Sequence, residues 1–445
     1  MMDRDKTIDL DFDPYFSAVQ QVRSVEIRGK IVKNVGLIAE AQGLSLSIGS
    51  ICAIENDQGE SILSEVVGFR DRRVLLMPYG DTLGIRPGSK VGLVEKNPKA
   101  QVGDHFLGRV INGMGFPIDG RGPIKADCEY PLYGSPINPM ERRSIREVMD
   151  VGVKSINAMI TLGRGQRVAI MAGSGVGKSV LMGMMTRHTE ADVTIIGLVG
   201  ERGREVKDFI ENILGEEGLR RAVVIAATSD SPPLVRMRGA YLATAMAEYF
   251  RDQGKNVLLI IDSITRFAMS SRDVGLAAGE PPTTRGYTPS FFVKIPILLE
   301  RAGSVTGKGS ITGIYTVLVE GDDLNDPVGD TVRSIVDGHI VLSRKLANKG
   351  HYPAIDVLES VSRVMRDVSE ADHMKARDAL IDIMASYRSA EDMIAIGAYV
   401  DGSDKIIDRA KKLMPKINEF LRQETQRKCP LSVCLSELQG LYTMK

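Results

Sequence analysis

The chain has 445 residues, enough for about three domains at roughly 150 residues each, and its 57 Lys and Arg residues balance 57 Asp and Glu residues. The zero net charge and the absence of tryptophan argue against a protein that binds nucleic acid along its length, and the four cysteines lack the spacing of a zinc site or a disulfide framework. No apolar run reaches the roughly 20 residues of a membrane span and the acidic first residues do not resemble a secretion signal, so we expect a soluble, cytoplasmic protein.

A polar arm, assigned to residues 1–24, precedes a first domain at 25–95. This domain has short β-prone segments separated by turn residues, which is typical of a small antiparallel barrel or sandwich. A stretch rich in Gly and Pro, from about 97 to 155, is expected to pack on the next domain. The strands predicted in the first domain are 29–35, 50–54, 64–69 and 73–77.

Strands and helices alternate in residues 96–365, which predicts an α/β fold whose parallel sheet is covered by helices on both faces. Residues 366–445 show helical periodicity alone, so we expect a C-terminal helical domain there. Strands are predicted at 167–171, 193–199, 222–227, 257–261, 313–319 and 339–342. Helices are predicted at 178–188, 206–214, 234–253, 371–387 and 405–424, the last interrupted at Pro415.

The segment AGSGVGKS, from Ala172 to Ser179, follows a predicted strand and opens a predicted helix, as a phosphate-binding loop does. Glycines let backbone N–H groups close around anionic oxygens. Lys178 would reach the β- and γ-phosphates, and the Ser179 hydroxyl would bind Mg²⁺. Ala172 stands where the usual motif has glycine, but this is the loop entry and a small residue should suffice. The predicted phosphate-binding residues are Gly173, Ser174, Gly175, Val176, Gly177, Lys178 and Ser179.

Two carboxylates follow predicted strands downstream of this loop. Asp262 ends the apolar run VLLIID and is the usual acidic partner of Mg²⁺ beside a phosphate-binding loop. Glu201 begins the run ERGRE and is suited to polarising a water for attack on a γ-phosphate, but a solvated charge cluster before a helix explains it equally well. By residue type alone, Tyr352 and Arg363 are better explained as a packing tyrosine and a surface arginine than as an adenine-stacking ring and an arginine finger.

Several long strings are similar to those of the rotary-type ATPase family, which includes the subunits of F- and V-type ATP synthases and the ATPases of type III secretion. The resemblance covers about residues 25–425, and within the family the flagellum-specific export ATPases match best. It implies a RecA-like core between the barrel and the helical domain. The matching strings are DSITRFA (262–268), GEPPTTRGY (279–287), EGDDLNDP (320–327), DGHIVLSR (337–344) and HYPAID (351–356).

The resemblance implies roles for individual residues and a bound ATP with Mg²⁺. Glu201 would position the attacking water, and Arg202 would lie beside the γ-phosphate. Glu205 and Asp262 would serve the Mg²⁺ shell together with Ser179.

Two further residues carry implications for assembly. Tyr352 would stack near the adenine, and Arg363 would reach into the site of a neighbouring subunit. The chain resembles catalytic subunits at Glu201 and arginine-donating subunits at the run SRV (362–364). Because it holds both halves of a shared site, we expect a homohexamer with ATP sites at its interfaces.

The implied function is ATP hydrolysis that energises flagellar type III protein export. The ring would act at the cytoplasmic face of the export apparatus. Its partners would be stalk-like and regulatory proteins, export substrates and chaperones. It could also contact the membrane peripherally through the export gate. The first alternative is the ATPase of a virulence secretion system. A nucleic-acid motor is disfavoured by the zero net charge. A proton-driven synthase subunit would need a separate subunit to donate the arginine. A ring that does not hydrolyse ATP would not need Lys178, Glu201 and Asp262.

Overall fold

The structure, a computed structural model, describes residues 28–319 and 326–444 together with Phe12 and Tyr15. It divides into two compact units, Met1–Asn97 and Pro98–Lys445, which are described separately. Most of the predicted arm at 1–24 and of the string at 320–327 lies outside the described residues. The predicted domain boundaries near 24, 95 and 365 stay predictions.

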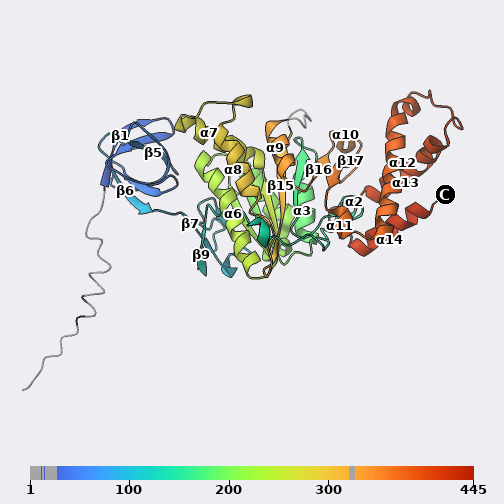
Figure 1. The fold of residues 1–445 in the computed structure, drawn as a ribbon, viewed down its shortest axis with the longest axis horizontal. Helices are drawn as coiled ribbons and strands as arrows, with labels where there is room; N and C mark the ends of the chain where they lie inside the picture. The colour runs from blue at the N-terminus through green and yellow to red at the C-terminus, as the bar shows by residue number, and fades with distance from the viewer. Residues whose placement is uncertain (1–11, 13–14, 16–27, 320–325, 445) are drawn as a thin grey trace, which may run out of the picture. The chain divides into compact units, whose positions relative to one another are not determined.

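The first unit is a closed antiparallel barrel with the strand order β1-β2-β5-β4-β3-β6, in which β1 also pairs with β6 (Figure 1). Alternate side chains point inward, as a half-buried strand requires, and Ile31, Ile54, Val66 and Leu76 form its core. A barrel is therefore the correct one of the two predicted architectures. Its strands are β1 (Arg28–Val35), β2 (Ile38–Gln42), β3 (Ile51–Glu55), β4 (Ser61–Arg70), β5 (Arg73–Pro78) and β6 (Lys90–Glu95).

The second unit is built on a nine-stranded sheet in the order β17-β16-β10-β15-β13-β11-β12-β8, with β14 paired to β15. Neighbouring strands are parallel except at β17 and β14. The central strand β10 lies between β16 and β15, so its carboxyl end is flanked by two other strands. The strands are β8 (Val110–Asn112), β10 (Arg167–Ala172), β11 (Val193–Val199), β12 (Ala222–Ala227), β13 (Asn256–Asp262), β14 (Gly303–Ser304), β15 (Ser310–Leu318), β16 (Gly338–Leu342) and β17 (Ile355–Ser362), while β7 (Lys99–Val102) and β9 (Cys128–Pro131) form a separate pair.

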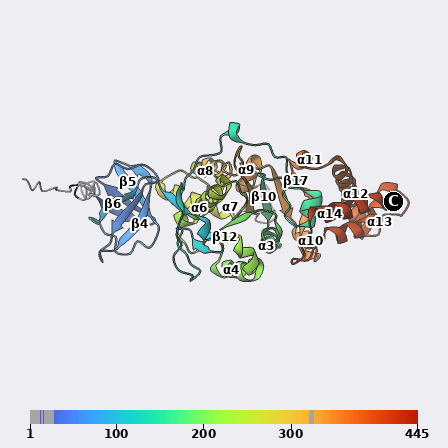
Figure 2. The same ribbon diagram turned by 90° about the horizontal axis from the view of Figure 1, so that it is seen from below.

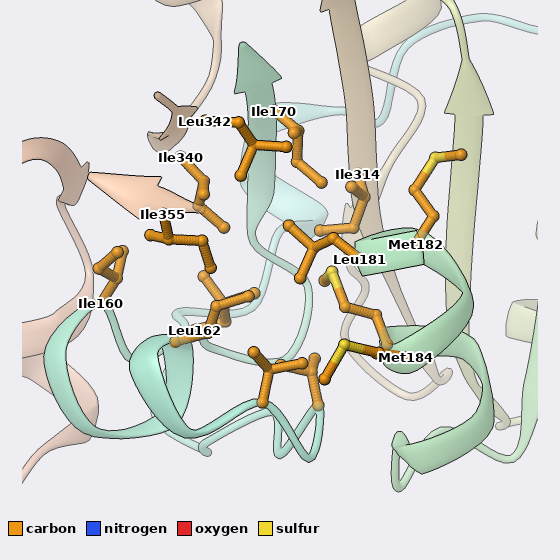
Figure 3. Close-up of a cluster of buried hydrophobic side chains, with 14 of the residues drawn as sticks. Ile160, Leu162, Ile170, Leu181, Met182, Met184, Ile314, Ile340, Leu342 and Ile355 are labelled. Atoms are coloured by element: carbon orange, nitrogen blue, oxygen red, sulfur yellow. The ribbon is translucent and has the colours of Figure 1, made fainter. Parts of the chain in front are cut away.

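Helices cover both faces of this sheet, as predicted (Figures 1 and 2). On one face, α6 (Pro233–Asp252) packs on β11, β12 and β13, and α7 (Ile264–Ala278) packs on β15. The other face is covered by α3 (Lys178–His188), whose Leu181 and Met182 belong to the same buried cluster as Ile170, Ile314 and Ile340 of the strands (Figure 3). Such two-sided burial explains why the strands are apolar on both faces.

Shorter helices connect these parts. The segment after β11 continues through a π-helical turn, η3, so the helix predicted at 206–214 is split between two elements. The remaining elements are η1 (Asp104–Phe106), η2 (Pro139–Glu141), α2 (Lys154–Met159), α4 (Gly203–Asp208), η3 (Phe209–Leu214), α5 (Gly215–Arg220), η4 (Thr284–Gly286), α8 (Pro289–Leu299), α9 (Pro327–Ile335), α10 (Arg344–Asn348) and α11 (Met365–Val368).

Three C-terminal helices, α12 (Ala371–Ala395), α13 (Lys405–Leu421) and α14 (Leu431–Thr443), pack on one another and on α2. The predicted interruption at Pro415 is wrong, because α13 runs through it. Pro415 lies on the exposed side of the helix, where water can satisfy the carbonyl that loses its N–H partner. Within the described ranges, no helix combines the length and apolar character needed to cross a bilayer.

Candidate nucleotide site

The predicted phosphate-binding loop joins the carboxyl end of β10 to the first turn of α3. Gly175 and Gly177 have φ angles of +77° and +95°, which only glycine adopts without strain. Gly177 is the N-cap of α3 and supplies no side-chain acceptor, so the first amides of this 11-residue helix have no side-chain cap. A loop of this shape offers its amides to an anion.

The Lys178 side chain is the centre of a buried charge cluster. Its Nζ lies 2.5 Å from Asp262 Oδ1 and 3.3 Å from Glu201 Oε1. All three side chains are largely buried: Lys178 is 11% exposed, Asp262 3% and Glu201 16%. Asp262 ends β13 and Glu201 follows β11, so the parallel strands bring both carboxylates to the edge of the sheet where the loop begins.

Electrostatics in this cluster are dominated by burial and by mutual attraction. Burial lowers the pKa of Lys178, but the charges of Asp262 and Glu201 outweigh it and the pKa is raised. Burial raises the pKa of Glu201, as does the neighbouring charge of Asp262, while Lys178 lowers it. One cation thus faces two carboxylates, a surplus of negative charge that a divalent cation would neutralise.

The donor set fits Mg²⁺ bound together with phosphate. Asp262 supplies a carboxylate, and Ser179 follows Lys178 in the first turn of α3. In the part of the chain that the structure describes, no group of three or more His, Cys, Asp or Glu residues is arranged to hold a metal. A magnesium ion here would therefore take its other ligands from phosphate oxygens and water, as Mg²⁺ usually does.

Arg202 and Glu205 flank the start of α4 and pair with each other at 3.0 Å. Their side chains are 80% and 52% exposed, so Arg202 points to solvent rather than into the charge cluster. Glu205 also shares a hydrogen bond with Glu201, which helps to raise the pKa of Glu201. The structure thus brings Lys178, Glu201 and Asp262 together, with Glu205 at their border.

Tyr352 lies beside the phosphate-binding loop. A Cβ built on Gly177 would be 3.6 Å from Cε1 of the Tyr352 ring, and the side chain is 46% exposed. The ring also lines a cavity of about 270 Å³ with Lys154, Arg422 and Arg427. A half-exposed ring between the loop and a cavity is placed to contact a base.

Arg363 lies at the opposite end of the sheet. Ala172 is in register with Leu342, which pairs with Ile355 at the start of β17, whereas Ser362 at the end of β17 pairs with Gly338. The exposed Arg363 is therefore separated from the loop by the length of a strand, roughly 15 Å at about 3.3 Å per residue. An arginine side chain does not span that distance, so Arg363 does not reach the loop of its own chain.

One residue at the site was missed by sequence reasoning. The Thr316 hydroxyl donates a 2.6 Å hydrogen bond to Asp262 Oδ1, and Thr316 is fully buried in β15. β15 lies between β10 and β13, so Thr316 stands beside both the loop strand and the strand that carries Asp262. The available signal was a threonine inside an otherwise apolar strand end, TVL at 316–318.

The fold and the loop geometry define a P-loop nucleotide-binding protein with a RecA-like core. Residues 152–362 match the model of the ATP synthase alpha/beta family, nucleotide-binding domain, and residues 31–92 match the beta-barrel domain of the same family. Residues 369–440 match the T3SS EscN ATPase C-terminal domain. The chain belongs to the ATP synthase alpha/beta family, as the resemblance predicted.

Individual relatives cover nearly the whole chain. The flagellum-specific ATP synthase of Bacillus subtilis (strain 168) is 49% identical over 425 residues, which are 95% of this chain and 97% of that protein. The assembled ATPase EscN from the type III secretion system of enteropathogenic E. coli superposes with a TM-score of 0.89 at 43% identity, covering 93% of this chain and all of that one. The same ATPase in complex with its central stalk EscO superposes with a TM-score of 0.86 at 41% identity, with equal coverage.

Proposed function

We propose that this chain hydrolyses ATP and thereby energises flagellar type III protein export. The main support is that Lys178 contacts both Glu201 and Asp262 at the N-terminus of α3, where no side chain caps the helix. The 49% identity to a flagellum-specific ATP synthase along almost the full length, against 46% to a type 3 secretion system ATPase of Xanthomonas euvesicatoria, supports flagellar clients.

In this mechanism the phosphates enter the loop from Gly173 to Ser179, and Lys178 moves from Asp262 to the β/γ oxygens. Ser179 and Asp262, with Glu205 close by, would hold Mg²⁺, and the bound ion would add positive charge beside the phosphates. Glu201 orients the attacking water, since its carboxylate lies beside Lys178 at the end of the sheet. Release of Lys178 from its two carboxylates is thus part of nucleotide binding.

Three other side chains complete the proposed site. The Tyr352 ring contacts the adenine from the edge of the loop. Arg202, which points to solvent within one chain, turns to the γ-phosphate when nucleotide is bound. Arg363 stabilises the charge that develops on the transferred phosphoryl group, and its distance from its own loop is the reason to place it at the site of a neighbouring subunit.

An arginine acting between subunits makes the active form an oligomer. We infer a homohexamer, because each chain carries both the carboxylate and the arginine of a shared site. The solved relative is an assembled ATPase with a central stalk, and a stalk-like partner follows for this chain. Regulatory proteins, chaperones and export substrates at the cytoplasmic face of the export apparatus are the remaining proposed partners, and nucleic acid is not among them.

The experiment that tests this proposal is ATP hydrolysis measured against protein concentration. Interfacial sites predict that specific activity rises steeply with concentration and then levels off. Specific activity that stays constant down to concentrations at which the chain is monomeric by light scattering would contradict sites shared between subunits. Polynucleotide should not stimulate the rate at physiological salt.

A further inference from the structure

Asp262 Oδ1 receives two hydrogen bonds, from Lys178 Nζ at 2.5 Å and from Thr316 Oγ1 at 2.6 Å. The carboxylate is 3% exposed, so water contributes little to its solvation. The negative charge on this oxygen is therefore stabilised by the Lys178 ammonium group, which can move, and by the Thr316 hydroxyl, which is fixed. Thr316 is fixed because it lies within β15, between the two strands that carry the loop and Asp262.

The two donors differ in what nucleotide binding does to them. Lys178 belongs to the first turn of α3, and under the proposed function its ammonium group moves to the phosphates. This movement removes the cation from a buried carboxylate, and a buried charge left without a partner is strongly unfavourable. The Thr316 hydroxyl does not move with α3, since it belongs to the central sheet.

We propose that Thr316 is a positioning residue whose hydroxyl holds Asp262 when Lys178 leaves, and so lowers the cost of transferring Lys178 to the phosphates. This inference rests on the proposed function, since it assumes that ATP binds at the loop. It assigns to Thr316 an effect on nucleotide affinity that does not require a metal ion. Loss of the hydroxyl leaves Lys178 as the main partner of Asp262 Oδ1 and holds it more tightly there.

The test measures ATP binding by calorimetry in EDTA, and again with Mg²⁺, for the full chain and its variants. Thr316→Val removes the hydroxyl at nearly constant volume and should weaken metal-free ATP binding by about tenfold, the size expected of one hydrogen bond to a charged group. Thr316→Ser keeps the hydroxyl and should restore binding to within about twofold of the unaltered chain.

Two controls separate positioning from a general loss of structure. Thr312 lies on the same strand, is equally buried, and its hydroxyl accepts from the Gly165 amide away from Asp262. Thr312→Val should lower the melting temperature yet leave metal-free ATP binding unchanged. In a Lys178→Met background, Thr316→Val should have no further effect, because no ammonium group has to leave Asp262.

The inference is overturned if Thr316→Val binds metal-free ATP as the unaltered chain does, or if its full effect persists without Lys178. Failure of the proposed function is recognised differently. In that case the unaltered chain itself does not bind ATP, with or without Mg²⁺. Binding of ATP by the unaltered chain together with an unaffected Thr316→Val variant rejects the role of Thr316 alone.

Discussion

The Lys178 ammonium group contacts both Asp262 Oδ1, at 2.5 Å, and Glu201 Oε1, at 3.3 Å, and so joins the ends of two strands to the first turn of α3. The three groups of this buried cluster are also those proposed to act on the phosphates. Stability and activity at this site are therefore coupled through one cation.

Replacement of Lys178 by methionine should affect both properties. ATP hydrolysis should fall at least about 100-fold, as expected when a preorganised group that stabilises developing charge is removed. The variant should also lose about 3–5 kcal/mol of unfolding free energy, since two buried carboxylates lose their cation. Steady-state kinetics and urea denaturation measure the two effects. A variant that retains normal activity would remove Lys178 from the mechanism.

The pH dependence of hydrolysis should report Glu201. Burial and the charge of Asp262 raise the pKa of Glu201 above its ordinary value, against the effect of Lys178, so this carboxyl takes up a proton at a higher pH than an exposed glutamate does. A protonated Glu201 is a weaker hydrogen-bond acceptor and cannot take a proton from the attacking water, so kcat/KM should decline on acidification while the protein remains folded.

The control for this profile is circular dichroism over the same pH range, which separates titration from acid unfolding. Glu201→Gln should be inactive at every pH, because the amide does not become a carboxylate. A rate that stays constant down to the range in which exposed glutamates titrate would show that Glu201 is not the group that limits activity.

Much of this site could be predicted because its signals are local. The loop from Gly173 to Ser179 joins a strand to the first turn of a helix, and Asp262 ends a strand after an uninterrupted apolar run. The cluster of Lys178 with both carboxylates depends on strand order, which one sequence does not contain. Thr316 was missed for the same reason, since its contact with Asp262 arises across neighbouring strands.

Other elements were missed because their patterns are weak. β17 is an antiparallel edge strand whose apolar residues are interrupted by Asp356, Glu359 and Ser360, so it lacks the apolar run that revealed the parallel strands. α7 was also missed, because it begins directly after β13. Two local signals were nevertheless present in the sequence: the N-cap Ser263, whose hydroxyl accepts a hydrogen bond from the Arg266 amide, and the C-cap Gly279. The predicted break at Pro415 failed because an exposed proline within a helix can be tolerated.

Tyr352 offers a test of base recognition. Since its ring, rather than its hydroxyl, lies beside Gly177, Tyr352→Phe should bind ATP normally, whereas Tyr352→Ala should weaken binding by about tenfold or more, the scale of stacking on a base. Equilibrium binding of ATP and of inorganic triphosphate distinguishes the cause. The alanine variant should lose affinity for ATP alone, and an equal loss for triphosphate would point to damage to the loop.

A separate prediction concerns stability away from the site. Arg301 is fully buried and binds Glu248 through two hydrogen bonds of 2.8 and 2.6 Å, with a third bond to the Leu132 carbonyl. Arg301→Met should cost about 3–5 kcal/mol of unfolding free energy, because Glu248 stays buried without its partner.

The double variant Arg301→Met with Glu248→Leu should recover most of this loss, since both charges are then replaced by apolar groups. Lys375→Met, which breaks an exposed ion pair with Asp372, is the matched surface control and should change stability by less than about 1 kcal/mol. Chemical denaturation measures all three variants. A double variant no more stable than Arg301→Met would show that packing, not charge burial, sets the cost.

Each ATP site is proposed to be completed by Arg363 of a neighbouring chain, and a mixture of two inactive variants tests this arrangement. Arg363→Ala and Glu201→Gln should each abolish most ATP hydrolysis when assembled alone. When they are mixed in equal amounts before assembly, about a quarter of the interfaces pair an intact Glu201 with an intact Arg363. Activity should return to roughly that fraction of the activity of the unaltered ring. A mixture no more active than its two components would contradict it.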